Sequence, residues 1–460
     1  MKFIGREEET RTIENILKKK GYQGCLIYGR RRIGKTELVK HCLMNKNVLF
    51  IMYQCKESSE QDNTYQLTKL LKQILGIEYI SFEHFMDAIR FVFEYSKNKE
   101  VYFVLDEYPY IRQTIDGCDS KLQEIIDSSA MNSNIKFFLL GSSISIMEEI
   151  QSHDNPLYMR FTSQILLRQM DYYDSSLFYP SFSLEDKVRL YTAFGGVPYY
   201  NAQIDENITV KENIIQMISG HFSSLKDFIE IYLKSELRKI NSANAVFETI
   251  ALGAFRFKDI FQASHIESTA MLSNVLQKLI QMDLIEYITP INDKTNKHKG
   301  GYRISDFCAK FYYNFIYRNE SAHNILDDLV FYEKFINEGF EKSSVPHAFE
   351  QIAKQYLIRE NKKGNLSPEL LDIGTYWYDN PKEKKNGQFD VVGKCKDGYV
   401  FYECKYTNAK ITDNIINEEI KEVSMTNLKP IKYGFFSKSG FDVNDKYSYL
   451  LYTLEDLYKK

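Results

Sequence analysis

Residues 25–36 read Cys25-Leu-Ile-Tyr-Gly29-Arg-Arg-Arg-Ile-Gly34-Lys35-Thr36, and this stretch decides the fold of the N-terminal third. The apolar run predicts a strand, and the residues after it fit the pattern G-x-x-x-x-G-K-[ST]. The glycines let the backbone wrap closely, so that successive N–H groups and the start of the next helix face an anion. A chance glycine-rich turn is the alternative, which the spacing disfavours. The predicted phosphate site comprises Gly29, Arg30, Arg31, Arg32, Ile33, Gly34, Lys35, Thr36 and Glu37.

The side chains at the end of this pattern carry its chemistry. Lys35 brings a mobile positive charge to the β- and γ-phosphates of a nucleotide, and the Thr36 hydroxyl is a ligand for Mg²⁺. The sequence therefore predicts that ATP and Mg²⁺ are cofactors.

Length and composition narrow the class of protein. With 460 residues the chain has room for about three domains of roughly 150 residues each. Its 44% hydrophobic and 26% charged residues exclude wholesale disorder, collagen-like structure and a membrane bundle. Its net charge of −3 excludes a polycation that coats nucleic acid nonspecifically. Seven cysteines without zinc-ligand spacing, and a charged N-terminus without a signal-peptide core, predict a cytoplasmic protein with no membrane partner.

Apolar runs that alternate with amphipathic stretches predict an α/β fold with a mainly parallel sheet in the first third. Strands are expected at 25–28, 48–53, 101–105, 136–140 and 163–167. The expected order of domains is an ATPase core (1–170), a helical lid (171–240), a winged-helix module (241–325), a linker (326–344) and a C-terminal α/β domain (345–460).

Hydrolysis needs carboxylates near the phosphates. The strand Val101-Tyr-Phe-Val-Leu-Asp106-Glu107 ends in two acids, so Asp106 is expected to hold Mg²⁺ and Glu107 to act as base for the attacking water. A solvated strand end is the alternative. Ser142, which follows the next strand, is expected to position that water; an ordinary turn or helix N-cap is equally compatible with it.

These motifs together resemble the archaeal-type ATPases of the STAND branch of P-loop NTPases, an AAA+-like family. Phe3-Ile-Gly-Arg-Glu7 resembles its F-x-G-R-E box, which lies near the adenine. Asn155-Pro-Leu-Tyr-Met-Arg160 resembles its P-L-Y-x-R segment, with Met159 in place of an expected glycine. The resemblance implies that Arg160 senses the γ-phosphate, of its own nucleotide or a neighbour's; a surface salt bridge is the alternative. Gly195-Gly-Val-Pro198 resembles the G-G-x-P turn, which implies that Pro198 packs by the base.

The middle module is expected to be a winged helix, with helices at 245–252, 257–263 and 267–282 and a hairpin from 284–288 and 302–304. Residues 241–320 carry nine Lys or Arg against eight Asp or Glu, and the third helix holds only Lys278. The wing turn, with Lys294, Lys297 and Lys299, is the only basic part. We therefore expect a packing or relay role, with weak contact to DNA phosphates at most.

Near the C-terminus, Asp390 is followed by Tyr399-Val-Phe-Tyr-Glu403-Cys-Lys405. Side chains alternate along a strand, so Glu403 and Lys405 share a face that Asp390 can reach across a hairpin. Two carboxylates would hold Mg²⁺ and Lys405 would help activate water. The pattern resembles the PD-(D/E)xK nuclease core, a restriction-endonuclease-like α/β fold, and Glu350 matches the acid of its first helix. A surface ion pair on an edge strand is the alternative.

The sequence thus predicts an ATP-hydrolysing switch joined to a magnesium-dependent nuclease domain that acts on DNA or another nucleic acid. The competing hypothesis is a non-nucleolytic, nucleotide-gated scaffold for signalling that binds DNA, a protein partner or a second copy of itself.

Overall fold

The computed structural model describes residues 3–44, 46–225, 230, 232–233, 240–295, 299–380, 385–424, 426 and 430–459. The chain forms two compact units, residues 1–169 and residues 170–460. None of the helices within the described ranges is long and apolar enough to cross a membrane.

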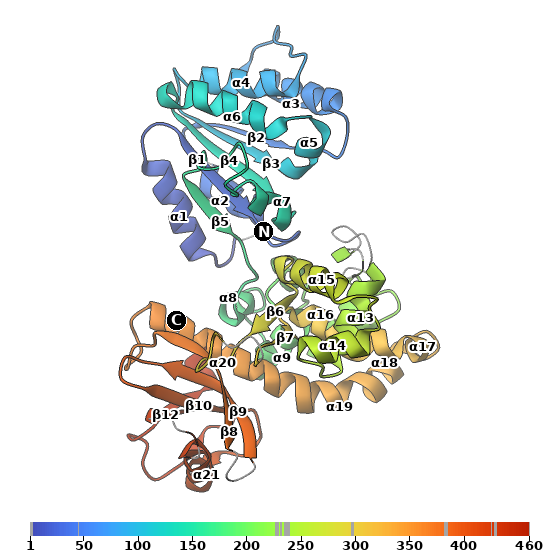
Figure 1. The fold of residues 1–460 in the computed structure, drawn as a ribbon, viewed down its shortest axis with the longest axis vertical. Helices are drawn as coiled ribbons and strands as arrows, with labels where there is room; N and C mark the ends of the chain where they lie inside the picture. Colours follow the sequence, from blue (N-terminus) through green and yellow to red (C-terminus); the bar gives the residue numbers. More distant parts are fainter. Residues whose placement is uncertain are drawn as a thin grey trace. The chain divides into compact units, whose positions relative to one another are not determined.

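The first unit is a five-stranded parallel sheet with the order β2-β3-β4-β1-β5 (Figure 1). The expected parallel sheet of the first third is confirmed. Its strands are β1 (Gln23–Tyr28), β2 (Leu49–Gln54), β3 (Val101–Asp106), β4 (Ile135–Gly141) and β5 (Ser163–Leu166). Its helices are α1 (Glu7–Lys18), α2 (Lys35–Leu43), α3 (Glu60–Leu75), α4 (Phe85–Tyr95), α5 (Tyr108–Thr114), α6 (Cys118–Ser129) and α7 (Ile144–Glu149), with a short 3₁₀ turn η1 (Ala130–Asn132).

Helices cover both faces of this sheet, which is why its strands are mostly apolar on both faces. In β1, Leu26 and Tyr28 pack in the core under α3 to α7, whereas Cys25 and Ile27 pack in the core under α1 and α2. Because all five strands run in parallel, their carboxyl ends meet at one edge of the sheet. The phosphate loop and the acids at the end of β3 lie at that edge.

The second unit begins with helices that run to about residue 219. They are α8 (Tyr172–Ser176), α9 (Leu184–Phe194), α10 (Pro198–Asn201), α11 (Val210–Ile214) and the π-helical turn η2 (Ile215–Ser219). Most of residues 226–239, at the end of the expected lid, lie outside the described residues, as does Lys297.

Three helices and a hairpin follow, as expected for residues 241–320. They are α13 (Ile240–Ala251), α14 (Phe257–Ser264), α15 (Thr269–Gln281), β6 (Ile285–Ile288) and β7 (Gly301–Ile304), with β6 and β7 antiparallel. After the hairpin come α16 (Phe307–Phe311), η3 (Tyr312–Ile316), η4 (Tyr317–Asn319) and α17 (Glu320–His323).

The stretch expected as a linker, 326–344, is helical instead. It comprises α18 (Asp328–Phe331), η5 (Tyr332–Ile336), α19 (Asn337–Gly339) and η6 (Phe340–Ser344), and it leads directly into α20 (Val345–Lys362). Phe331, Ile336 and Phe340 are fully buried in the core of the second unit, which outweighs the acidic residues around them. Pro346 does not break the helix because it lies in the first turn of α20, where a missing N–H costs little.

The C-terminal sheet has the order β14-β12-β10-β9-β8. β10 is parallel to β12, as β12 is to β14, while β9 is antiparallel to both β8 and β10. The elements of this region are β8 (Asp372–Asn380), β9 (Lys385–Lys394), β10 (Tyr399–Lys405), β11 (Ile411–Thr412), α21 (Asp413–Ser424), β12 (Pro430–Ser437), β13 (Phe441–Asp442), β14 (Leu450–Thr453) and α22 (Leu454–Leu457).

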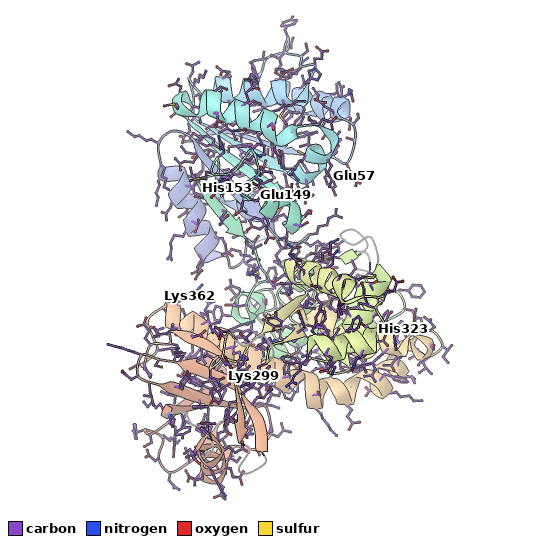
Figure 2. The ribbon with its side chains drawn as sticks, viewed as in Figure 1. Glu57, Glu149, His153, Lys299, His323 and Lys362 are labelled. Carbon is purple, nitrogen blue, oxygen red and sulfur yellow. The ribbon has the colours of Figure 1, made fainter. Side chains whose placement is uncertain are left out.

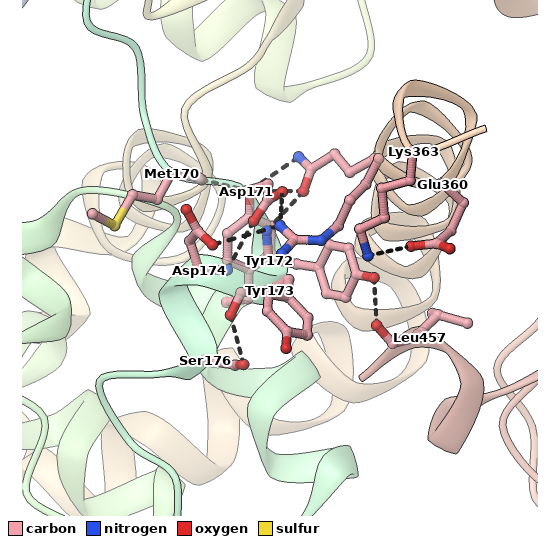
Figure 3. Close-up of polar contacts among 12 residues, drawn as sticks. Met170, Asp171, Tyr172, Tyr173, Asp174, Ser176, Glu360, Lys363 and Leu457 are labelled. Carbon is pink, nitrogen blue, oxygen red and sulfur yellow. Dashed lines mark hydrogen bonds and ion pairs between the residues drawn. The ribbon is translucent and has the colours of Figure 1, made fainter. Parts of the chain in front are cut away.

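A partly buried polar cluster connects the start of the second unit to its C-terminal part (Figure 3). Arg359 of α20 forms ion pairs with Asp171 at 3.2 Å and Asp174 at 3.5 Å, and its guanidinium lies 3.9 Å from the ring centroid of Tyr173. Tyr172 donates a hydrogen bond of 2.6 Å to the carbonyl of Leu457 in α22. The helix after the first unit is therefore fixed to both α20 and the last helix of the chain.

Replacing Arg359 with methionine should destabilise the second unit by about 1–2 kcal/mol, because two carboxylates and an aromatic face lose their cation. Urea denaturation measures the change as a lower midpoint. Lys342→Ala, which removes an exposed pair with Glu338 in the same unit, is the control and should leave the midpoint unchanged. Equal midpoints for Arg359→Met and the wild type would contradict the role of this cluster.

Candidate nucleotide and metal sites

The phosphate loop, residues 29–36, connects β1 to α2. Gly29 has φ 150° and Gly34 has φ 94°, and Arg32 between them is also left-handed at 66°. A Cβ atom at Gly29 would lie 2.3 Å from the carbonyl oxygen of Leu167, so both the space and the conformation require glycine. The Lys35 ammonium donates to the carbonyls of Gly29 at 2.8 Å and Arg30 at 3.1 Å, and it is thereby held under the loop.

The first residues of α2 contact the end of β3. The Thr36 hydroxyl donates a 2.6 Å hydrogen bond to the Asp106 carboxylate. Asp106 is only 2% exposed, and burial raises its pKa although the bond from Thr36 opposes this. A cation beside the carboxylate would offset this cost of burying its charge.

Glu107 faces the strand next to β3. Its backbone is left-handed, with φ 54°, which turns the side chain back over the sheet edge. The Glu107 carboxylate accepts hydrogen bonds from the Ser142 backbone N–H at 3.0 Å and from its hydroxyl at 2.7 Å. Strand β4 lies between β1 and β3, so Ser142 lies between the phosphate loop and the two acids.

Two arginines of the loop take separate positions. Arg30 is 2% exposed, and Arg31 donates a 2.6 Å hydrogen bond to the Tyr110 hydroxyl in α5. Arg32 and Glu37 are exposed at the surface, and Glu37 pairs with Lys40.

Arg6 of the F-x-G-R-E box stabilises the phosphate loop through hydrogen bonds to backbone carbonyls, a role that the sequence analysis did not predict. Its guanidinium donates to the carbonyls of Ile33 at 3.2 Å and Arg168 at 2.7 Å, and it pairs with Glu9 at 3.0 Å. Phe3 stacks on His41 of α2 with 4.0 Å between the ring centroids. These contacts require an arginine at position 6 despite its left-handed backbone, with φ 64°.

The structure does not bring Arg160 to the phosphate loop. Arg160 precedes β5, and its carbonyl accepts a hydrogen bond from Tyr22 just before β1, so it lies at the amino-terminal edge of the sheet. Its guanidinium pairs with Asp127 of α6 at 3.0 Å. A role on the chain's own nucleotide is thus corrected to the salt bridge that the sequence had left as the alternative, because the loop follows the opposite ends of the strands.

Pro198 belongs to the other unit, where it begins α10. Its expected contact with the base stays a prediction.

The C-terminal acids and lysine gather on one face of the second sheet. Tyr402 of β10 pairs with Val391 of β9, so the next residues along the register, Glu403 and Asp390, point to the same side. Lys405 forms an ion pair with Glu403 at 2.5 Å. Burial raises the pKa values of both Asp390 and Glu403, and the Glu350 carboxylate adds to each shift. Asp390 raises the pKa of Glu403 further, whereas Lys405 opposes that shift.

Two side chains that the sequence analysis missed join this cluster. Burial and the nearby Glu403 carboxylate raise the pKa of Glu419 in α21. Lys354, one helical turn after Glu350 in α20, has a pKa lowered to about 8 by burial and by Arg303. Its ammonium donates a 3.3 Å hydrogen bond to Thr375. The sequence signal that could have identified Lys354 is its position four residues after Glu350, which puts both side chains on one face of a helix.

The donor atoms fit magnesium at the first site. Thr36 and Asp106 offer a hydroxyl and a carboxylate in contact, and Mg²⁺ prefers such oxygens together with phosphate oxygens. At the second site Asp390 and Glu403 offer carboxylates, whereas Glu350 pairs with His347 at 3.2 Å. Within the described ranges, no three His, Cys, Asp or Glu side chains are gathered as a metal site.

Comparison with known proteins finds two separate family matches, the first of which extends beyond the first unit. Residues 3–204 match the family described as an ATPase domain predominantly from Archaea, and residues 312–422 match a family of archaeal and bacterial proteins of unknown function. The first match and the geometry of the loop agree: the N-terminal unit has the fold and the phosphate loop of a P-loop ATPase domain.

Two relatives come from Methanocaldococcus jannaschii. An uncharacterized protein is 27% identical over 380 residues, covering 82% of each chain. An uncharacterized ATP-binding protein is 23% identical over 292 residues, covering 52% of this chain and 76% of its own. Among solved structures, a Walker-type ATPase of Pyrococcus abyssi matches 68% of this chain and 96% of its own with a TM-score of 0.52 at 17% identity, which is a likeness of fold.

The electrostatics of Lys354 make a prediction about pH. A lysine whose pKa falls from 10.5 unfolded to about 8 folded destabilises the protein below pH 8, and the penalty disappears as pH rises towards 10.5. Lys354→Met should therefore raise the free energy of unfolding by about 1–3 kcal/mol at pH 7 and by little at pH 10.

The control is Lys362→Met, at an exposed position of the same helix, which should show no such dependence (Lys362 is labelled in Figure 2). Urea denaturation at both pH values measures the effect. A Lys354→Met variant that is less stable than the wild type at pH 7 would mean that the surrounding carboxylates hold this lysine charged.

Proposed function

We propose that this protein is an ATP-hydrolysing switch whose C-terminal domain is a magnesium-dependent nuclease. The ATPase part rests on the phosphate loop together with the contacts of Asp106 and Glu107. The nuclease part rests on the shared face of Asp390, Glu403 and Lys405.

In the ATPase site each residue has a separate task. The N–H groups of residues 29–36 and the Lys35 ammonium bind the phosphates, while Thr36 and Asp106 hold Mg²⁺. When bound, Mg²⁺ neutralises charge on the β- and γ-phosphate oxygens. Glu107 accepts the proton of the attacking water, and Ser142 orients the Glu107 carboxylate at 2.7 Å. Pro198 beside the base and Arg160 on a second copy's γ-phosphate complete the proposal.

One contact carries the ATPase assignment: the 2.6 Å bond from Thr36 to Asp106. It joins residues that are 70 apart in the sequence and brings a hydroxyl and a carboxylate oxygen together beside Lys35, which supports a site for a metal-bound phosphate. A solvated strand end would not hold a buried carboxylate against the first turn of α2.

Lys35→Ala should abolish ATP hydrolysis and weaken ATP binding, because the loop loses its cation. Ser142→Ala should lower kcat roughly tenfold and leave the affinity for ATP unchanged, because Glu107 loses one of two donors. Phosphate release under saturating ATP measures kcat.

Ser143→Ala is the matched control for Ser142, since the Ser143 hydroxyl contacts only Ser145 at 3.4 Å among the described residues. It should keep the wild-type kcat. Undiminished turnover in Lys35→Ala would refute the site.

The nuclease proposal is supported by the topology as well as by the three side chains. The helix α20 precedes β8, β9 and β10, and the helix α21 leads to β12 parallel to β10. This order is compatible with a restriction-endonuclease-like core. Asp390 and Glu403 would hold Mg²⁺, which when bound stabilises charge on the phosphodiester. Glu403 raises the pKa of Lys405 against the effect of burial, so this lysine stays protonated and orients water or phosphate.

The three helices and hairpin of residues 240–304 support a winged-helix module that relays the nucleotide state. The third helix, α15, carries Lys278 as its sole basic residue. This composition disfavours sequence-specific recognition of bases in the major groove of DNA. Contact with DNA phosphates is the role that this charge pattern allows.

A supercoiled plasmid incubated with Mg²⁺ tests the nuclease. Asp390→Ala and Lys405→Ala should each reduce nicking by at least about a hundredfold, because a metal ligand or the activating cation is lost. Lys396→Ala, at the exposed end of the β9–β10 hairpin, is the control and should nick like the wild type.

Nicking that persists unchanged in both variants would refute the assignment. Binding of the plasmid without nicking by the wild type would favour the non-nucleolytic scaffold.

A further inference from the structure

A cavity of about 770 Å³ lies in the second unit between two parts of the chain. One wall comes from the end of α13 and the strand β7, and the other from β8, β9 and the start of α20. Asp390, one of the proposed metal ligands, is part of the lining. The hairpin module and the C-terminal sheet therefore share one concave surface, and it ends at the proposed nuclease site.

The lining of this cavity is rich in cations. Arg256, Lys299, Arg303 and Lys310 line it, against the single carboxylate of Asp390 (Lys299 is labelled in Figure 2). Glu286 partly neutralises Arg303 at 2.5 Å, and Asp293 lies 3.7 Å from Lys299.

The backbones of Arg256 and Lys310 are hydrogen-bonded within their helices, but their side chains form no hydrogen bond or ion pair with any part of the chain that the structure describes. Burial and Arg303 lower the pKa of Lys310 to about 8, and the Glu350 carboxylate opposes this shift without forming an ion pair with Lys310. A phosphate group would supply the missing negative charge.

Aromatic rings form another part of the same lining. Phe255 and Trp377 meet edge to face, with ring centroids 5.3 Å apart, and Tyr378 follows in β8. Nucleic-acid bases stack on such rings without regard to sequence. Cations beside aromatic rings are the combination that binds single-stranded nucleotides, since one holds the phosphate and the other the base.

The volume of the cavity limits the size of the ligand that can bind in it. Small-molecule sites span roughly 300–1,000 Å³, so the cavity has room for one or two nucleotides but not for a duplex. A strand end or an unpaired segment could enter, and its next phosphodiester would lie towards Asp390.

We propose that this cavity binds a single-stranded, 5′-phosphorylated nucleic-acid end, with its phosphate at Arg256 and Lys310 and its base against Phe255 and Trp377. This inference rests on the proposed nuclease function in one respect only, namely where the phosphodiester to be cleaved would lie. It makes the hairpin module part of the substrate site rather than a reader of duplex sequence.

Trp377 is the only tryptophan of the chain, so its fluorescence reports directly on this cavity. The probe is a 5′-phosphorylated tetrathymidylate, added in EDTA to prevent cleavage. Saturable quenching is expected, with binding weakened about tenfold or more in Lys310→Met and in Arg256→Ala because each loses a charge-assisted contact. Arg256 is exposed, so its variant keeps the fold if Lys310→Met does not.

Two further variants distinguish this proposal from the alternatives. Lys278→Ala removes an exposed cation of α15 and should bind the probe like the wild type. Asp390→Asn should bind the probe at least as tightly while losing any nicking. If the probe quenches Trp377 in a wild-type protein that does not nick the plasmid, the nuclease assignment is wrong and the cavity proposal still holds.

The cavity proposal fails if the probe does not quench Trp377, whether or not the wild type nicks. It also fails if a blunt hairpin duplex binds as tightly and Lys278→Ala abolishes that binding. That pattern would place the nucleic acid on α15 instead.

Discussion

The hydrogen bond between Thr36 and Asp106 is the contact on which the N-terminal domain depends. It requires three things at once: a loop after β1 that only glycine can make at position 29, a parallel sheet with β4 inserted between β1 and β3, and a carboxylate buried at the end of β3. The strand order also places Ser142 beside Glu107. The polar site is therefore a consequence of the sheet, since parallel strands bring residues from distant parts of the sequence to one edge.

Much of this domain could be predicted because its signals are local. The glycines, Lys35 and Thr36 lie within eight residues, and apolar runs mark strands that are buried on both faces. The support that Arg6 gives to the loop could not be predicted, because it depends on a left-handed backbone and on a carbonyl 162 residues away. Arg160 matched a motif, yet its partner is Asp127 at the other edge of the sheet. A match to a sequence motif therefore does not determine at which end of a strand a residue lies.

In the second unit the alternation of β10 predicted that Glu403 and Lys405 share a face. The acidic run at 326–344 suggested a linker, but the apolar side chains among its charges pack at helical spacing and continue into α20. Lys354 and Glu419 were missed because only the folded sheet brings them to the acids of β9 and β10. The cavity beside Asp390 depends on contacts between the hairpin module and the C-terminal sheet, which no local pattern encodes.

The central claim is that residues 29–36, with Asp106, hold a magnesium-bound triphosphate. Isothermal titration calorimetry of the full chain with ATP tests it most directly, run once with Mg²⁺ and once with EDTA. The account predicts one ATP bound per chain, more tightly with Mg²⁺ than without, since Thr36 and Asp106 bind the nucleotide through the metal. No heat of binding under either condition, or an affinity that Mg²⁺ leaves unchanged, would contradict it.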